Sequence, residues 1–232
     1  MSLSIILPCY NPPEGWAENI LANYKVLRQK IEGPIELIVV NDGGRDKGIR
    51  KADITYLEEQ IKELKFIGYD TNMGKGHAVR YGMERANGEL LMYTDIDFPY
   101  DTTSFISIYQ ALKSGRCDVA AGIKNKNYYD KVPFVRRQIS KYLRFLIRIF
   151  LSMPISDTQC GLKGFTQKVK PLFLQTTIDR YIFDLEFIRN CFKNNLKVEA
   201  IPVQLNEDVH FRKMNPKILT SEIINFIKLL LK

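Results

Sequence analysis

Two carboxylates stand two residues apart in the segment 94–99 (TDIDFP), directly after a short apolar run that is typical of a buried strand. At that spacing Asp95 and Asp97 would repel each other unless a cation lies between them. A hard divalent cation such as Mg²⁺ or Mn²⁺ prefers carboxylate oxygens and can share its shell with a diphosphate. A polar turn that caps the next helix is the alternative, with Asp101 as the N-cap. Because that cap leaves the first two aspartates unexplained, the sequence favours a metal site.

Two further polar loops follow apolar runs nearer the N-terminus. The segment 8–13 (PCYNPP) follows the first run, and the segment 41–44 (NDGG) follows the second. Both segments are rich in residues that favour turns for conformational reasons, which is a sufficient explanation by itself. The alternative is a binding loop, in which Tyr10 would stack on a base while Asp42 accepts a hydrogen bond from it.

A lysine flanked by glycines, in the segment 72–76 (NMGKG), runs directly into a predicted helix. Backbone amides, the helix dipole and the charge of Lys75 would converge on an anion there. The spacing differs from that of a Walker A loop, and Val79 stands where a dinucleotide-binding fingerprint has its third glycine. The segment therefore predicts either a phosphate contact or a plain helix start.

Short apolar runs alternate with helical patterns through the first half of the chain. Strands are expected at 3–7, 35–40, 65–69, 89–94 and 118–122, and helices at 16–31, 52–64, 76–86 and 102–114. This alternation predicts an α/β fold with a mostly parallel sheet and helices on both faces. In such sheets ligands bind beyond the carboxyl ends of the strands, where the polar loops described above lie.

The second half of the chain is less regular. A basic, aromatic loop is expected at 124–134, helices at 135–153, around 181–194 and at 217–231, a turn and short strand at 157–165, and a strand at 197–205. The sequence shows no internal repeat, low-complexity tract or Gly/Ser-rich linker. We therefore expect residues 1–232 to form a single domain.

Composition excludes several classes of protein. Four cysteines without a CxxC pair and only two histidines argue against a zinc or multi-histidine centre and fit reduced thiols in a cytosol. The longest uncharged stretch, 1–13, is too short to span a membrane and lacks the basic start of a signal peptide. The net charge of +8 is uneven, because residues 1–115 carry −3 and residues 116–232 carry +11. An anionic partner of the second half is expected, although simple solubility also explains a basic surface.

A basic stripe runs along the predicted helix 135–153. Arg137, Lys141, Arg144 and Arg148 share one face, at steps of four, three and four residues. The other face is apolar, with Ile139, Tyr142, Leu143, Leu146, Ile149 and Phe150. A basic stripe beside a wide apolar arc is typical of a helix that lies in a membrane interface. Packing of an ordinary amphipathic helix on the core, with its cations in water, is the alternative.

Five segments occur in an order that resembles family 2 glycosyltransferases with the GT-A nucleotide-sugar fold: IILPCYN, IELIVVNDGG, NMGKGHAVRYGM, LMYTDIDFP and DTQCGLKGF. The similarity runs from Leu3 to about Val203 and is greatest to the dolichyl-phosphate glucosyltransferase and dolichyl-phosphate mannose synthase branch. It implies an inverting, metal-dependent transfer of a hexose from a UDP- or GDP-sugar to a polyprenyl phosphate. Residues 1–122 would then bind the nucleotide sugar and residues 123–232 the acceptor.

The resemblance also implies roles for individual residues. Four residues would hold the base and ribose, with two more nearby: Pro8, Tyr10, Asn11 and Asp42, then Asn72 and Lys75. Asp95 would contact the nucleotide, and Asp97 would ligate Mg²⁺ or Mn²⁺ directly. In the mannose synthase branch an arginine and a serine four residues later bind the lipid phosphate, and Arg136 and Ser140 show that spacing. Lys124 and Arg212 are further expected contacts to that phosphate.

The acceptor decides whether a general base is needed. A phosphate acceptor is already ionised and needs only positioning and a stabilised leaving group. A hydroxyl on a soluble or lipid-linked glycan would need a carboxylate base, for which Asp157, Asp184 and Glu186 are the candidates. The expected catalytic residues are Asp157 and the metal ligand Asp97. Asp184 and Glu186 also stand at the start of a predicted helix, where the helix dipole favours negative charge.

The leading hypothesis is therefore a cytoplasmic enzyme that is peripherally associated with an anionic membrane surface. A glycosyltransferase acting on a surface glycan is the first alternative. A basic nucleic-acid-binding protein would explain the charge of the second half. It would leave Asp95 and Asp97 unexplained, so no nucleic-acid partner is expected.

Overall fold

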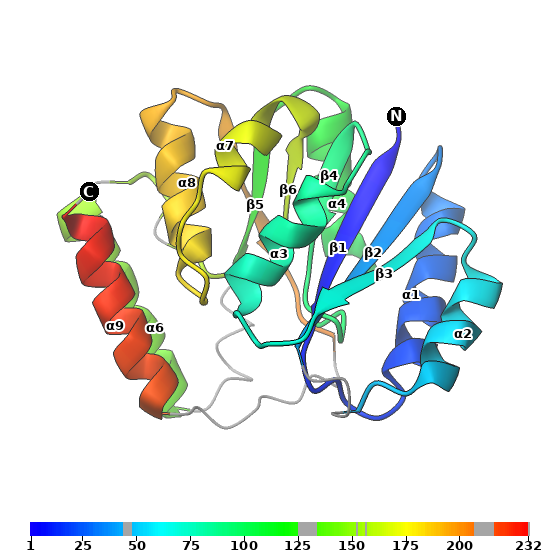
Figure 1. The fold of residues 1–232 in the computed structure, drawn as a ribbon. Coiled ribbons are helices and arrows are strands. Elements are labelled where there is room, and N and C mark those ends of the chain that lie inside the picture. The colour runs from blue at the N-terminus through cyan, green and yellow to red at the C-terminus, as the bar shows by residue number, and fades with distance from the viewer. Residues whose placement is uncertain (44–47, 125–133, 152, 156, 207–215, 232) are drawn as a thin grey trace.

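A seven-stranded sheet forms the centre of the computed structural model, which describes residues 1–43, 48–124, 134–151, 153–155, 157–206 and 216–231 (Figure 1). The strands are β1 (Leu3–Cys9), β2 (Ile35–Asp42), β3 (Leu64–Tyr69), β4 (Leu90–Tyr93), β5 (Val119–Lys124), β6 (Lys163–Thr166) and β7 (Val198–Val203). Their order is β3-β2-β1-β4-β6-β5-β7. Strand β6 runs antiparallel to β4 and β5, and the other neighbouring pairs are parallel. The predicted mostly parallel sheet is confirmed.

Helices cover both faces of this sheet. They are α1 (Trp16–Lys30), α2 (Lys51–Gln60), α3 (Lys75–Glu84), α4 (Thr102–Lys113), α6 (Phe134–Leu151), α7 (Lys170–Leu174), α8 (Phe183–Lys193) and α9 (Pro216–Leu230). Helices α1, α2 and α4 bury their apolar sides in one core, together with alternate residues of β1 such as Ile5. Helices α3, α7 and α8 form a second core that includes Ile6 of the same strand. Successive residues of β1 thus lie in different cores, which is why the strand has a continuous apolar run.

Most predicted elements are confirmed, and the differences have local causes. Helix α2 ends at Gln60 instead of residue 64, because Leu64 already begins β3. A 3₁₀ turn (Gln167–Val169) and α7 follow β6 where no helix was expected. These two elements are too short to show a helical period in the sequence. The predicted basic loop lies almost entirely at residues 125–133, outside the described residues.

Helices α6 and α9 stand at the side of the sheet opposite α1 and α2 (Figure 1). Ile147 of α6 and Phe226 and Leu229 of α9 are buried in the second core. Among the described residues, no helix has both the length and the apolar character needed to cross a membrane.

Candidate active site

The candidate residues from the first half lie in loops after parallel strands. Tyr10 and Asn11 follow β1, Asp42 ends β2, Asn72 lies after β3, and Asp95 lies after β4. Because these strands are parallel neighbours, their carboxyl ends share one edge of the sheet. The fold therefore gathers the predicted donor loops at that edge.

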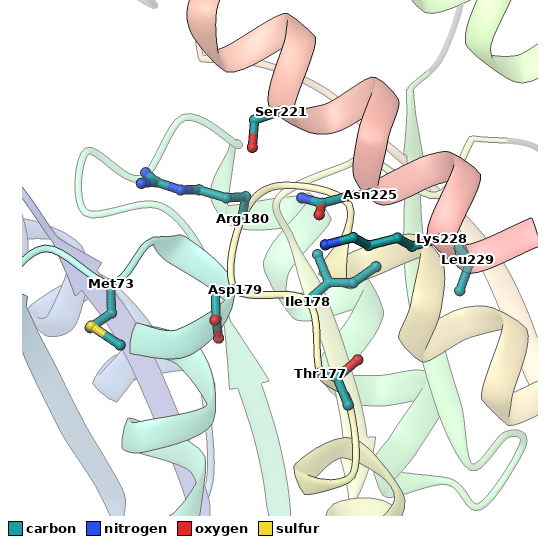
Figure 2. Close-up of a pocket in the computed structure, with 9 residues that line it drawn as sticks. All are labelled: Met73, Thr177, Ile178, Asp179, Arg180, Ser221, Asn225, Lys228 and Leu229. Carbon is teal, nitrogen blue, oxygen red and sulfur yellow. The ribbon is translucent and has the colours of Figure 1, made fainter. Parts of the chain in front are cut away.

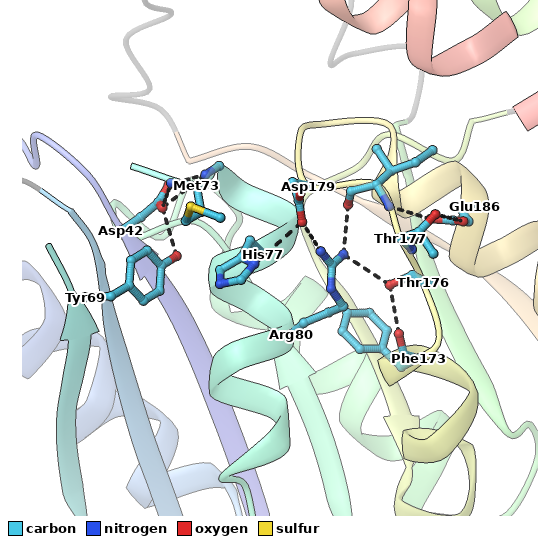
Figure 3. A network of polar contacts seen from close by, with 12 residues as sticks. Asp42, Tyr69, Met73, His77, Arg80, Phe173, Thr176, Thr177, Asp179 and Glu186 are labelled. Atoms are coloured by element: carbon cyan, nitrogen blue, oxygen red, sulfur yellow. Dashed lines mark hydrogen bonds and ion pairs between the residues drawn. The ribbon is translucent and has the colours of Figure 1, made fainter. Parts of the chain in front are cut away.

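Asp42 ties the loop after β3 to the end of β2 (Figure 3). Its buried carboxylate accepts hydrogen bonds from the Tyr69 hydroxyl at 2.8 Å, the Asn72 side-chain amide at 2.9 Å, and the backbone amides of Met73 and Gly74 at 2.8 and 3.0 Å. Burial, followed by the hydrogen bond to Asp42, raises the pKa of Tyr69, so the phenol remains a donor. The described contacts of Asp42 are thus to protein donors, and a hydrogen bond to a base would be additional to them.

The N-terminus of α3 is closed by a loop from the second half of the chain. The carbonyl of Asp179 accepts hydrogen bonds from the amides of Gly76 at 2.8 Å and His77 at 3.3 Å. A Cβ on Gly76 would lie 2.5 Å from the Ile178 carbonyl oxygen, so the close approach requires glycine. The amides of Met73, Gly74, Gly76 and His77 are therefore engaged by protein groups, and the structure favours the plain helix start over a backbone anion site.

The side chain of Lys75 lies against Asp95 instead. Its ammonium is 2.5 Å from Asp95 Oδ1, and the side chain is only 14% exposed. Burial lowers the pKa of Lys75, but the nearby carboxylates of Asp95 and Asp184 outweigh it and hold the pKa above its ordinary value. Gly161 packs beside this pair, since a Cβ there would lie 2.6 Å from Asp95 Oδ2. A positive charge is thus fixed next to the proposed metal ligand.

Asp95 and Asp97 share one turn. The Phe98 amide donates to the Asp95 carbonyl at 3.0 Å, and Phe98 adopts the left-handed φ of 46° that non-glycine residues rarely adopt. The Asp97 carbonyl accepts from the Asn19 side chain at 3.0 Å, and the Asp97 side chain is exposed. The next helix has its own cap, because Asp101 accepts from the Ser104 amide at 2.8 Å. The N-cap alternative therefore accounts for Asp101 alone.

The donor set of this turn fits a hard divalent cation. Two carboxylates supply only oxygen atoms and leave most of a coordination shell for water and phosphate, as Mg²⁺ sites commonly do. No cluster of three or more His, Cys, Asp or Glu side chains suited to a metal occurs within the described ranges. The chain would therefore share such a cation with a ligand instead of enclosing it.

The loop after β1 presents an exposed ring. Tyr10 is 37% exposed, and Asn11 beside it has a φ of 47°, again in the left-handed region. Pro8 lies within β1 itself. Backbone strain of this kind clusters at functional sites, and it occurs here in two loops at the same edge. Stacking of a base on Tyr10 stays a prediction.

Two residues expected on the acceptor side contact each other. The Lys124 amide donates to Asp157 Oδ2 at 2.8 Å, and the Lys124 ammonium lies 3.9 Å from Asp157 Oδ1. Both side chains are largely buried. Arg136 and Ser140 lie in the first half of α6, one helical turn apart, but their side chains and the whole of Arg212 fall outside the described residues.

The other two candidate bases are buried in structural contacts. Asp184 forms an ion pair with Lys163 at 2.9 Å and accepts a hydrogen bond from the Tyr93 hydroxyl. Glu186 accepts from the amides of Thr177 at 2.8 Å and Ile178 at 2.9 Å and so shapes the loop that closes α3 (Figure 3). Both are engaged and buried, so a role of either as a base stays a prediction.

Several residues of this region were missed by sequence reasoning. Arg80 donates to the Ile178 carbonyl at 2.8 Å and pairs with Asp179, which fixes the loop over α3. Lys163 is fully buried beside Asp184. For Lys163, the only signal in the sequence was a lysine inside a short apolar strand. For Arg80 there was no signal, because its partners are distant in the sequence.

Comparison with known proteins places the chain among enzymes. The sequence profile described as glycosyl transferase family 2 matches residues 4–171, most of the chain. The chain belongs to glycosyl transferase family 2. Dolichyl-phosphate beta-glucosyltransferase from Drosophila melanogaster is 29% identical over 221 residues, covering 89% of this chain and 68% of the relative. The Saccharomyces cerevisiae protein of that name is 25% identical over 224 residues, covering 88% and 67%. The chain thus spans about two thirds of the length of these relatives.

Solved structures agree on the fold. Glucosyl-3-phosphoglycerate synthase from Mycobacterium tuberculosis, in complex with Mn²⁺, uridine diphosphate and glucosyl-3-phosphoglycerate, has a TM-score of 0.70 at 14% identity, covering 99% of this chain and 78% of its own. Mannosyl-3-phosphoglycerate synthase from Rubrobacter xylanophilus has a TM-score of 0.69 at 14% identity, covering 100% and 73%. The predicted GT-A fold and glycosyltransferase class are confirmed.

Proposed function

We propose that this family 2 glycosyltransferase moves a hexose, with inversion, from a UDP- or GDP-sugar to a polyprenyl phosphate. The observation that carries the proposal is the Lys75–Asp95 pair beside the exposed Asp97, at the edge where the donor loops meet. The sequence relatives named dolichyl-phosphate beta-glucosyltransferase support a dolichyl-phosphate acceptor. The neighbouring structure with Mn²⁺ and uridine diphosphate supports a nucleotide donor and a divalent cation.

The donor would lie along the carboxyl edge of the sheet. Tyr10 stacks on the base, and Pro8, Asn11, Asp42 and Asn72 shape its pocket together with the ribose site. Asp95 and Asp97 would hold Mg²⁺ or Mn²⁺, and the cation would supply charge neutralisation at the leaving diphosphate. Lys75 adds a further positive charge at the same place.

The acceptor phosphate attacks the anomeric carbon from the side opposite the leaving group. A bond forms between that carbon and a phosphate oxygen, the bond to the diphosphate oxygen breaks, and the configuration inverts. No proton has to be removed, because the attacking phosphate oxygen is already ionised. Arg136 and Ser140 hold this phosphate, with Lys124 and Arg212 as further contacts.

The carboxylates of the second half support an acceptor that needs no base. Asp184 and Glu186 are buried in structural contacts, and Asp157 is paired with Lys124. A glycan hydroxyl would need Asp157 to leave that pair first. The glycan acceptor is therefore the alternative that the assay below must distinguish.

The outer surface of α6 and α9 supports peripheral attachment at a cytoplasmic membrane face. Large apolar side chains are about half exposed or more on both helices: Tyr142, Phe145, Ile149 and Phe150 on α6, and Ile223, Ile224 and Ile227 on α9. Lys141 and Arg148 are exposed on α6. Apolar and cationic side chains on one surface are typical of a helix that binds an anionic membrane interface.

A donor and acceptor screen tests the proposal. UDP-glucose, UDP-galactose, UDP-N-acetylglucosamine and GDP-mannose are offered with Mn²⁺ and a polyprenyl phosphate, and the anomeric configuration of any product is determined by NMR. Transfer to lipid phosphate with inversion is expected for one donor. Transfer only to a glycan, or retention of configuration, would contradict it.

The metal site has its own test. Asp97→Asn should remove the Mn²⁺-dependent tightening of nucleoside diphosphate binding, measured by calorimetry, while the circular dichroism spectrum is unchanged. The exposed Glu58→Gln on α2 serves as the control. Wild-type titration curves for Asp97→Asn in Mn²⁺ would rule out its role as a ligand.

A further inference from the structure

Helix α9 has apolar side chains on its outer face as well as on the face that packs on the core. Ser221, Asn225 and Lys228, spaced by four and three residues, line a cavity between α9 and the body of the protein (Figure 2). Ile223 and Ile227 are 54% and 51% exposed. A helix on a water-soluble surface normally directs its apolar residues inwards. Here Phe226 and Leu229 are buried in the second core, but isoleucines also lie outside, beside the polar stripe that lines the cavity. The exposed isoleucines indicate that the outer face meets an apolar medium.

The cavity between α9 and the loop that closes α3 has a volume of about 450 Å³. Met73 and the segment 177–180 form its other wall (Figure 2). Two cations line it, Arg180 and Lys228, while the single acidic lining residue, Asp179, is paired with Arg80. Lys228 is an exposed residue. Glu222 of α9 interacts electrostatically with Arg180. The lining therefore has two cations beside one paired aspartate, and Glu222 balances only part of their charge.

We propose that this cavity binds the phosphate of an anionic phospholipid headgroup while the outer face of α9 lies in the membrane interface. An interfacial helix buries its apolar face about 5–10 Å into the boundary between headgroups and acyl chains. The flank of α9 that carries Lys228 then lies at the depth of the lipid phosphates. A guanidinium and an ammonium, with the hydroxyl of Ser221 and the amide of Asn225, are suitable partners for phosphate oxygens.

The position of Arg180 gives the site a consequence for the proposed function, on whose membrane attachment this inference rests. Arg180 Nη1 lies 3.4 Å from Asn72 Oδ1, and the Asn72 side-chain amide donates a hydrogen bond to Asp42 in the donor region. A headgroup held by Arg180 would lie beside the carboxyl edge of the sheet. Binding of one lipid would thus orient that edge towards the bilayer that contains the acceptor.

Vesicle binding tests the site against general electrostatics. Neutral phosphatidylcholine vesicles are doped with phosphatidic acid or phosphatidylglycerol to the same surface potential, and binding is measured by co-sedimentation. The wild type should prefer phosphatidic acid, whose phosphate monoester is accessible, by about tenfold. Arg180→Gln/Lys228→Gln should remove this preference. The control Lys141→Gln/Arg148→Gln removes two exposed charges from α6 and should weaken binding to both vesicles equally.

Three results would overturn the site. The first is that the wild type shows no preference for phosphatidic acid at matched surface potential. The second is that Arg180→Gln/Lys228→Gln behaves like the α6 control. Alternatively, inorganic phosphate at low millimolar concentration would abolish the preference, which would indicate a site for free phosphate. Binding of UDP or GDP with Mn²⁺ is measured on the wild type and on both variants as a separate test of the proposed function. Failure of the wild type to bind any nucleotide would count against the proposed function and leave the lipid result standing.

Discussion

Lys75 pairs with Asp95, one of the two proposed ligands of the divalent cation. Lys75 is largely buried and lies 2.5 Å from Asp95 Oδ1. A divalent cation on Asp95 would repel the ammonium, so the two cannot share that oxygen. The diphosphate of a donor would resolve the conflict by drawing Lys75 onto its own oxygens. At the scale of single residues, we therefore expect cation and nucleotide to bind together more tightly than either alone.

Replacing Lys75 separates these effects. In Lys75→Met, Mn²⁺ alone should bind about tenfold more tightly, measured by electron paramagnetic resonance, because Asp95 is released and a positive charge is lost. Nucleoside diphosphate should bind more weakly by about 1.5–3 kcal/mol, the range of a hydrogen bond to a charged group, and free nucleoside should be little affected. Lys65→Met is the matched control, since that lysine pairs with Glu36 away from the site. Unchanged Mn²⁺ binding, with equal weakening of both nucleotide ligands, would mean that Lys75 is only structural.

At the scale of elements, sequence period and position predicted the strands and the loops after them. Apolar runs such as that of β1 identify a buried strand, and parallel order then places Asp42 and Asp95 at one edge. Contacts between distant segments were beyond prediction. The amides around Lys75 suggested an anion site, but the Asp179 carbonyl, from the second half of the chain, occupies two of them. A local pattern cannot show which group closes a helix.

The docking of α9 should depend on pH through Glu222. One of its oxygens accepts from the Ile182 amide at 2.8 Å, and the other is buried without a partner in the described chain. Burial raises the pKa of Glu222, although the backbone hydrogen bonds and Arg180 act against it. A carboxyl with a raised pKa in the folded state stabilises fully below its unfolded pKa. This contribution is lost as pH rises through the folded value.

Glu222→Gln should therefore change the pH dependence of stability. The amide stays neutral, so the thermal midpoint of the variant should rise relative to the wild type as pH increases from about 4 to 7. The two proteins should converge in acid. The exposed Glu58→Gln on α2 should show no such trend. A constant difference between Glu222→Gln and the wild type across this range would show that the carboxyl does not titrate against α9 docking.

At the scale of the whole molecule, one buried ion pair joins the sheet to the helices on one face. Lys163 on β6 and Asp184 on α8 are 0% and 5% exposed, with 2.9 Å between ammonium and carboxylate. The Tyr93 hydroxyl on β4 donates to the same carboxylate. Hydrophobic patterning predicted the two cores on either side of the sheet, but it gives no signal for an ion pair inside one of them. Charges in this position are retained at a cost in desolvation.

A double-mutant cycle measures how far the fold depends on this pair. Lys163→Met leaves a buried carboxylate, and Asp184→Asn leaves a buried ammonium, so each should lower the free energy of unfolding in urea by about 3–5 kcal/mol. The double variant removes both charges, and the amide oxygen introduced by Asp184→Asn would still accept the hydrogen bond from Tyr93. The double variant should therefore lose less free energy of unfolding than either single variant. The exposed Lys113–Glu32 pair, treated in the same way, should show almost no coupling. Additive losses at Lys163 and Asp184 would mean that the two charges are stabilised by other groups, and the pair would then not be what joins β6 to α8.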